Sequence, residues 1–409
     1  MLVEIENFGV INRADLEIGK LNIIVGENST GKSASARLLF SLLTALSEGT
    51  LIGNENIKKR LVNFVDYWKF KGSDEMKLKL GQIKNSLQNA KTTQFKDMHS
   101  KITHILKEND FDDKDICMRD LKRLKNVIDI NSDESSKYHA VFKHLICSEY
   151  GASLNEFKNA DITFHGKSNG VTFKQKIGDA SLSEDFLNYF NFQNVVYIDS
   201  PSLFENISCS PQLHLKMLER KLKNYDLYED EFNNDLNQFK KSIDELIGGE
   251  FEYNVSDDVF IFKSDDKELP MQALSSGVKQ LGILQVLVKN NELTRNTFLI
   301  LDSPEANLHP DFQVKLAEIL VSASKELNIT LYITTHSPFM VEAFEVYARY
   351  YSILDETNFY LAEKIENKEK YDYIKLDEND ILEAYNNLGY PFNTLNEVRF
   401  ECDLRDDLG

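Results

Sequence analysis

A glycine-rich loop near the start of the chain sharply limits the folds open to it. The loop matches the pattern G-x-x-x-x-G-K-[ST] and has the sequence Gly26-Glu27-Asn28-Ser29-Thr30-Gly31-Lys32-Ser33. Residues 21–25 before it are an apolar run typical of a buried strand, and residues 34–46 after it have an Ala- and Leu-rich helical pattern. A strand, a glycine-rich loop and a helix in this order are typical of phosphate binding, so we expect an α/β core around this strand.

This P-loop also predicts how a nucleotide is held. Backbone N–H groups of such a loop, and of the helix N-terminus that follows it, point at phosphate oxygens. We expect Lys32 to reach the β- and γ-phosphates of ATP, and Ser33 to supply a hydroxyl to Mg²⁺. The predicted ATP-binding residues of the loop are Gly26, Asn28, Ser29, Thr30, Gly31, Lys32 and Ser33.

A second apolar segment ends in a carboxylate, which indicates the metal side of the same site. Residues 298–302 are Phe298-Leu299-Ile300-Leu301-Asp302, the pattern of a buried strand with an acidic end. In P-loop proteins such a carboxylate, called Walker B, holds Mg²⁺ opposite the P-loop hydroxyl. We therefore predict that Ser33 and Asp302 share one Mg²⁺ ion.

Two further segments carry polar side chains at the ends of expected elements. A helical pattern that continues to about residue 289 opens with Leu274-Ser275-Ser276-Gly277-Val278-Lys279-Gln280. A strand pattern closes with Thr334-Thr335-His336-Ser337-Pro338. Taken alone, Ser275 fits an ordinary helix N-cap, and a single histidine after a strand is more often structural than functional. Their order around the 298–302 strand favours the functional interpretation for both.

In this order the motifs resemble the ATPase heads of ABC and SMC proteins. The 274–280 segment is similar to their L-S-G-G-Q signature, which implies that Ser275 and Gly277 bind the γ-phosphate of a nucleotide. His336 stands where these ATPases carry a switch histidine, which implies contact with the γ-phosphate or the attacking water. In such heads the signature cannot reach the P-loop of its own chain. The resemblance therefore implies a C₂ homodimer that encloses two ATP molecules head to tail.

A narrower resemblance is to the OLD-like AAA family ATPases of bacteria, which include ATPase subunits of Septu-type antiphage systems. Its most characteristic residues are Asn307-Leu308-His309-Pro310, shortly after the 298–302 strand. Residues 5–9 and 380–398 fit the same branch, and the resemblance covers roughly 1–50 and 194–400.

The residue after Asp302 departs from the ABC and SMC pattern. Most of these heads have a catalytic Glu there that polarises water, whereas this chain has Ser303. Glu305 is the nearest carboxylate and is typical of the OLD-like branch, so it is our candidate base, and His336 is the second candidate catalytic residue. The alternative is a slow enzyme that uses ATP mainly to join two heads.

The composition of the chain changes between its ends and its middle. Residues 54–193 are rich in Lys, Glu, Asp and Asn and have long helical periodicities, with short strand patterns near 161–164 and 171–176. We predict an α/β fold with an ABC-type ATPase head, a mixed sheet with flanking helices and an inserted, mainly helical lobe. The head would comprise 1–53 and 194–409, and the lobe would comprise 54–193.

Charge and hydropathy exclude some classes of partner. The formal net charge is −19, whereas a protein that binds duplex nucleic acid strongly by itself usually has a basic face. Nucleic-acid binding is therefore expected to be weak for the isolated chain. No apolar run is long enough for a membrane span, and the N-terminus lacks the pattern of a signal peptide, so we expect a cytoplasmic protein without a membrane partner.

These features lead to one leading hypothesis and two alternatives. OLD-like enzymes often carry a TOPRIM nuclease domain, and the part of the chain after His336 is too short for one. We expect an ATPase that acts as the sensor or regulator subunit of an antiphage system and controls a separate effector, such as a nuclease or toxin. The first alternative is a RecF- or SMC-like DNA-repair ATPase that acts directly on DNA. The second is a nucleotide-locked scaffold with negligible hydrolysis.

Overall fold

A mixed ten-stranded sheet forms the framework of the larger of two compact units. The computed structural model describes residues 1–51, 65, 78–84, 95–108, 142, 145–146, 148–150, 160–168, 171–176, 192, 194–199, 212–223, 234–254, 257–264, 267–377, 380, 381, 384, 388, 395, 396 and 398–400. The larger unit comprises 1–43, 144–179 and 183–409, and the smaller unit comprises 44–143 and 180–182.

The order of strands in the sheet explains why distant motifs meet. The strands lie in the order β5 (Val171–Lys176), β4 (Asp161–Ser168), β1 (Leu2–Phe8), β2 (Ile11–Glu17), β13 (Tyr371–Leu376), β12 (Thr357–Lys364), β3 (Leu21–Val25), β11 (Thr330–Thr335), β10 (Thr297–Asp302) and β6 (Asn194–Ile198). The last five strands of this order are mutually parallel. Their carboxyl ends therefore share one edge of the sheet, where ligands of α/β proteins bind.

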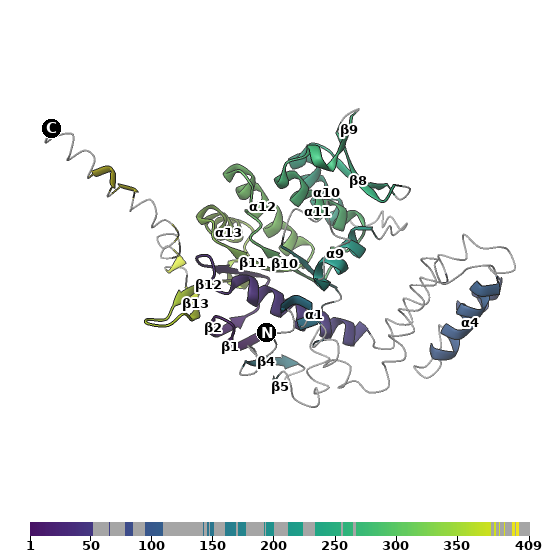
Figure 1. Ribbon diagram of the computed structural model, residues 1–409, viewed down its shortest axis with the longest axis horizontal. Helices are drawn as coiled ribbons and strands as arrows, with labels where there is room; N and C mark the ends of the chain where they lie inside the picture. The colour runs from purple at the N-terminus through teal and green to yellow at the C-terminus, as the bar shows by residue number, and fades with distance from the viewer. Residues whose placement is uncertain are drawn as a thin grey trace. The chain divides into compact units, whose positions relative to one another are not determined.

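Alternating side chains of the parallel strands pack on opposite faces of the sheet, because successive residues of a strand point to opposite sides. One set, which includes Ile23, Leu301 and Ile333, forms a core with a group of helices. These helices are α9 (Leu213–Lys223), α10 (Asn234–Ile247), α11 (Ser276–Lys289), α12 (Pro310–Glu326) and α13 (Pro338–Tyr350), and Figure 1 shows them gathered on one side of β10 and β11.

The opposite face of the sheet is covered by the first part of α1 (Lys32–Leu51), the helix that follows the P-loop. Phe40 packs near the Tyr197 ring of β6, with 5.7 Å between ring centroids. The hydroxyls of Ser35 and Tyr332 are hydrogen bonded at 2.7 Å. Both faces of the parallel strands are thus buried, which agrees with their nearly continuous apolar sequences.

A small antiparallel sheet stands beside the helices. It contains β7 (Glu250–Asn254), β8 (Val259–Ser264) and β9 (Lys267–Pro270), and two short 3₁₀ helices are η4 (Met271–Ala273) and η5 (Leu354–Glu356). Strands β7 and β8 form an antiparallel hairpin, with Phe251 opposite Phe262. Gly282 of α11 lets this sheet approach, because a Cβ atom there would lie 2.3 Å from the Phe251 ring.

The described part of the smaller unit is helical. Helix α4 (Phe95–Glu108) buries Met98 and Ile102, and Leu80 of residues 78–84 is also buried. These positions belong to the apolar stripes that indicate helices in the sequence. Most of the helical periodicity predicted for residues 54–193 lies outside the described residues.

The sheet includes a strand that sequence patterns place within the inserted lobe. Strand β4 pairs antiparallel with β1, with Val3 opposite Phe164. The boundaries at 53 and 193 stay a prediction. The fold class is confirmed: the structure is α/β, with a mixed sheet and helices on both faces.

Candidate functional site

The P-loop turns the chain from β3 into α1 with two residues in the left-handed region. Ser29 has φ 66° and Gly31 has φ 91°. A Cβ atom on Gly31 would also lie 2.8 Å from Cγ1 of Ile11, so a larger residue there would strain the loop. Asn28, Ser29 and Ser33 are exposed, whereas Gly26 and Thr30 are buried. The loop is therefore built around a glycine turn with polar groups on its open side.

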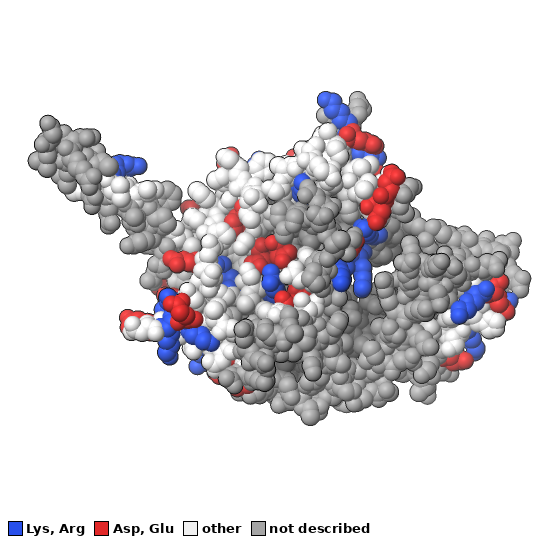
Figure 2. Space-filling model, in the orientation of Figure 1, with Lys and Arg blue, Asp and Glu red and all other residues white. Residues whose placement is uncertain are grey.

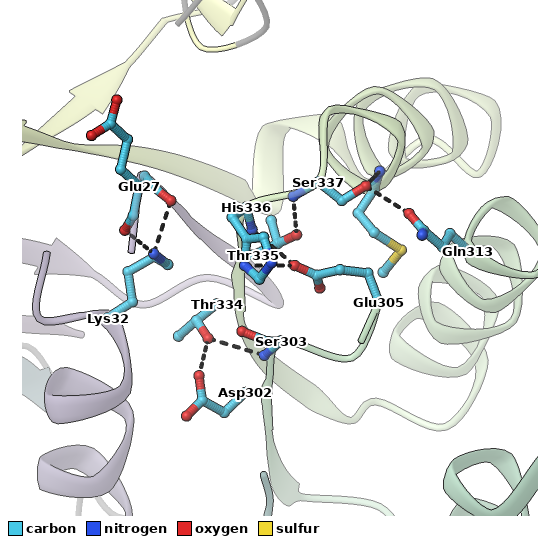
Figure 3. Close-up of polar contacts among 12 residues, drawn as sticks. Glu27, Lys32, Asp302, Ser303, Glu305, Gln313, Thr334, Thr335, His336 and Ser337 are labelled. Carbon is cyan, nitrogen blue, oxygen red and sulfur yellow. Dashed lines mark hydrogen bonds and ion pairs between the residues drawn. The ribbon is translucent and has the colours of Figure 1, made fainter. Parts of the chain in front are cut away.

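Lys32 points into the loop from the first turn of α1. Its Nζ atom donates to the carbonyl oxygens of Gly26 at 2.8 Å and Glu27 at 2.5 Å (Figure 3). Burial lowers the pKa of Lys32, and nearby carboxylates, Asp302 foremost, partly offset this effect. The ammonium group is thus held at the centre of the loop, close to the acidic end of β10.

Asp302 receives hydroxyl groups on both carboxylate oxygens. Its Oδ1 atom accepts from Ser33 Oγ at 3.0 Å and from Thr334 Oγ1. Its Oδ2 atom accepts from the Tyr197 hydroxyl at 3.0 Å. Burial, followed by the charge of Asp302, raises the pKa of Tyr197 well above its usual range, so this hydroxyl keeps its proton.

The Ser33 and Asp302 pair fits a Mg²⁺ ion. Hydroxyl and carboxylate oxygens are the hard ligands that Mg²⁺ prefers, and few protein groups are needed because the ion keeps several waters. Ser33 is exposed while Asp302 is only 7% exposed, so the pair offers one open side and one fixed side. Asp302 and Ser33 come from different segments that the structure brings to 3.0 Å, and their sharing of a Mg²⁺ ion stays a prediction.

A strained turn connects Asp302 to Glu305. Ser303 has φ 52°, a left-handed conformation that non-glycine residues rarely adopt. Its N–H group donates to the carbonyl oxygen of Thr334 at 3.0 Å, which fixes the turn against the end of β11. The turn brings the Glu305 carboxylate into contact with the residue after β11.

Glu305 and His336 contact each other through one carboxylate oxygen. Glu305 Oε1 accepts from the His336 backbone N–H at 2.9 Å and lies 3.2 Å from His336 Nδ1. Within the described residues, the other oxygen, Oε2, is buried without a hydrogen-bond partner. The Glu305 side chain is 5% exposed and that of His336 is 44% exposed. Glu305 is therefore buried beneath a histidine that reaches the surface.

Ser337 and Gln313 hold the strand end that carries His336. Ser337 is the N-cap of α13, and its hydroxyl donates to Gln313 Oε1 at 2.6 Å. Gln313 in turn donates to the carbonyl oxygen of Leu308 at 3.0 Å. Sequence reasoning missed Gln313, Thr334 and Tyr197 as site residues. The adjacency of Thr334 to His336 was the only signal for any of them.

Ser275 and Gly277 lie at the start of α11. Ser275 is the N-cap of this helix, with its Oγ accepting from the Val278 N–H at 3.4 Å, and it is exposed. Gly277 is buried, and a Cβ atom there would lie 2.6 Å from Cδ2 of Leu308. Both residues thus have structural roles in the chain, and their contact with phosphate stays a prediction.

The fold and this site define a P-loop ATPase domain. The chain belongs to the AAA ATPase domain family, whose model matches residues 1–341. No curated protein matches the chain in sequence.

Solved structures of SMC heads are similar to the chain at low identity. An SMC head bound to the C-winged helix domain of ScpA has 12% identity and a TM-score of 0.43, covering 93% of this chain and 98% of that one. The SMC head domain from Thermotoga maritima has 12% identity and a TM-score of 0.41, covering 92% and 98%. Among the helices of the described residues, none is long and apolar enough to cross a membrane.

Proposed function

We propose that this chain binds Mg²⁺-ATP at the carboxyl edge of the parallel strands and hydrolyses it. The observation that carries the proposal is the 3.0 Å contact between Ser33 of the P-loop and Asp302 of β10, beside the buried ammonium group of Lys32. Two segments that are far apart in sequence thus place a cation, a hydroxyl and a carboxylate together. This is the set of groups that binds a nucleoside triphosphate and its metal.

Each residue has a distinct task in this proposal. Lys32 and the N–H groups of the loop bind phosphate oxygens, while Ser33 and Asp302 hold the metal, directly or through water. Bound Mg²⁺ neutralises the charge that develops on the phosphoryl group. Glu305 is the base: His336 contacts its Oε1, and Oε2 has no hydrogen-bond partner among the described residues. His336 orients Glu305 and reaches toward the γ-phosphate from the exposed side.

The complete site would require two chains. Ser275 is exposed at the N-terminus of a 14-residue helix, where orphan N–H groups favour an anion. We propose that Ser275 and Gly277 of one head close over the ATP that is bound by the P-loop of another. Because each head supplies both halves, the result is a C₂ homodimer with two sites.

We further propose that this ATPase is the regulatory or sensor subunit of a bacterial antiphage system, acting in the cytoplasm on a separate effector such as a nuclease. The support is the sequence resemblance at Asn307-Leu308-His309-Pro310. The net charge of −19 agrees with weak DNA binding by the chain itself. On the face drawn in Figure 2, basic and acidic side chains of the described residues are interspersed.

Calorimetric titration of ATP in the presence of Mg²⁺ tests the nucleotide site. We expect Lys32→Ala to weaken binding by about 10–100-fold, since bonds from a charged donor contribute about 1.5–3 kcal/mol. Lys241→Ala is the matched control, because Lys241 is an exposed lysine of α10 that forms an i,i+4 ion pair with Glu245. Equal affinity in the wild type and Lys32→Ala would contradict the site.

A further inference from the structure

A buried network of polar side chains contacts Asp302 at Oδ2, the carboxylate oxygen that Ser33 does not contact. Tyr197 of β6 donates its hydroxyl to Asp302 Oδ2 at 3.0 Å, and Tyr197 is 1% exposed. Arg37 of α1 donates from Nε to the Tyr197 hydroxyl oxygen at 3.3 Å. Its Nη2 atom also lies 3.6 Å from Asp199 Oδ2. Neither Tyr197 nor Arg37 belongs to the motifs that indicate the site.

The chemistry of the donors fixes the direction of each hydrogen bond between Arg37, Tyr197 and Asp302. A guanidinium group has donors only, so the Tyr197 oxygen must accept from Arg37. The single hydroxyl proton of Tyr197 is then left for Asp302, whose ionised carboxylate only accepts. The bond from Tyr197 to Asp302 therefore has one direction, and it is of the stronger, charge-assisted kind.

Arg37 contacts Asp199, which belongs to a buried cluster of ionisable side chains. His214 lies between two carboxylates, with Nε2 at 3.1 Å from Asp199 Oδ2 and Nδ1 at 2.5 Å from Glu149 Oε2. The side chains of His214 and Glu149 are fully buried. Rings also pack here, because the centroids of Tyr197 and His214 are 4.7 Å apart. Tyr197 thus has little freedom to leave Asp302.

The two oxygens of Asp302 have different surroundings. Ser33 and Thr334 both contact Oδ1, whereas Tyr197 contacts Oδ2. A carboxylate that is held at one oxygen can still rotate about its last side-chain bond, but a carboxylate that is held at both cannot rotate without losing a bond. Tyr197 therefore supplies the contact that fixes which oxygen faces Ser33.

We propose that Tyr197, supported by Arg37, is a positioning residue that fixes the Asp302 carboxylate for the metal. The inference rests on the proposed Mg²⁺-ATP site. When the Ser33 hydroxyl is engaged by a cation, Tyr197 and Thr334 are the side chains of the described residues that still hold Asp302 by hydrogen bonds. Partners of this kind that orient a metal ligand typically change metal affinity about 10–100-fold when they are removed.

The test is the Mg²⁺ dependence of ATP binding by the full chain, measured with a fluorescent ATP analogue. Tyr197→Phe removes one hydroxyl and keeps the ring that packs against Phe40 and His214. We expect the Mg²⁺ concentration for half-maximal binding to rise about 10-fold, with unchanged analogue affinity in EDTA. With Mn²⁺ as the probe, the electron paramagnetic resonance line shape of the ternary complex should also change.

A second buried tyrosine provides the matched control. Tyr360 lies on β12, four strands away from β6 in the sheet, and its hydroxyl accepts from the Glu17 backbone N–H at 2.7 Å. Tyr360→Phe should therefore leave the Mg²⁺ dependence at the wild-type value. If Tyr197→Phe binds the analogue with the wild-type Mg²⁺ dependence, the positioning role is refuted.

Two outcomes separate this proposal from the function on which it rests. If the wild type binds no ATP with or without Mg²⁺, the proposed function fails and the positioning role fails with it. If the wild type binds and Tyr197→Phe does not fold, as judged by thermal unfolding, Arg37→Lys decides, because it keeps the charge but loses the planar fork. A shift of the Mg²⁺ dependence in the same direction supports the proposal, and no shift overturns it.

Discussion

The two halves of the candidate site differ in how firmly the chain holds them. At the ends of β10 and β11, Asp302 and Glu305 are buried, and their carboxylates accept several hydrogen bonds from neighbouring segments. At the start of α11, Ser275 is exposed and its hydroxyl accepts one long bond of 3.4 Å from its own helix. The first half is organised within one chain, whereas the second presents its polar groups outward. This difference is what a site completed by a second copy requires.

The largest expected effect concerns the half of the site that contains Asp302 and Glu305, which we call the buried half. Glu305→Gln keeps the shape of the side chain and removes the proton acceptor, so we expect turnover to fall about 10²–10⁴-fold while ATP binding persists. Steady-state phosphate release and calorimetry measure the two quantities. Glu342→Gln, on the exposed side of α13, is the control and should keep wild-type turnover.

If appreciable wild-type turnover survives in Glu305→Gln, Glu305 is not the base, and His336 would be the next residue to test. Wild-type turnover no greater than that of Lys32→Ala would support the nucleotide-locked scaffold instead. Only the second result would show that this half of the site is organised for binding alone.

A smaller effect is expected for the exposed half. Ser275→Arg places a bulky side chain where a second head would close, so the ATP-dependent dimer should become at least about 10-fold weaker, equivalent to 1.4 kcal/mol. ATP binding by the monomer should change little. Analytical ultracentrifugation with and without ATP measures the dimer.

Ser275→Ala separates the steric effect from loss of the helix cap. Both variants lose the cap, which contributes about 1 kcal/mol to stability, but only Ser275→Arg adds bulk. Dimerisation of Ser275→Arg at the wild-type ATP concentration would refute the head-to-tail arrangement.

The smallest effect concerns the strain in the buried half. Ser303 has φ 52°, which costs a non-glycine residue about 1–2 kcal/mol, while glycine loses about 0.5–1 kcal/mol of backbone entropy. We expect Ser303→Gly to raise the free energy of unfolding by about 0.5 kcal/mol. Ser322→Gly, within α12, should lower it by about the same amount. Urea unfolding measures both, and destabilisation by Ser303→Gly would show that the serine is held by more than its backbone.

Sequence patterns predicted the P-loop and the strand before Asp302 because both are local signals. The order of apolar, glycine and hydroxyl residues in 21–33 specifies a strand, a turn and a helix without any distant contact. The pairing of Ser33 with Asp302 was predicted from the Walker B pattern, and the structure explains it because parallel strands end at one edge of a sheet. These parts of the site are therefore predictable from the sequence.

The remaining contacts depend on strand order, which no local pattern contains. Tyr197 is 105 residues from Asp302 in sequence and Thr334 is 32 residues away, yet all three meet because β6 and β11 flank β10. Strand β4 joins β1 for the same reason, although it follows a helical region. The left-handed turn at Ser303 was equally hidden, since serine has no strong preference for positive φ.

The contact between Gly277 and Leu308 has a consequence for kinetics. The start of α11 rests on Leu308, and the N–H group of Leu308 donates to the carbonyl oxygen of Glu305 at 3.0 Å. Binding of a neighbouring nucleotide at Ser275 would therefore shift Leu308 and, with it, the turn that carries Glu305, the proposed base, in the same chain. Under the proposed dimer, filling one site would alter the rate at the other, so phosphate release should rise with ATP concentration more steeply than a simple hyperbola.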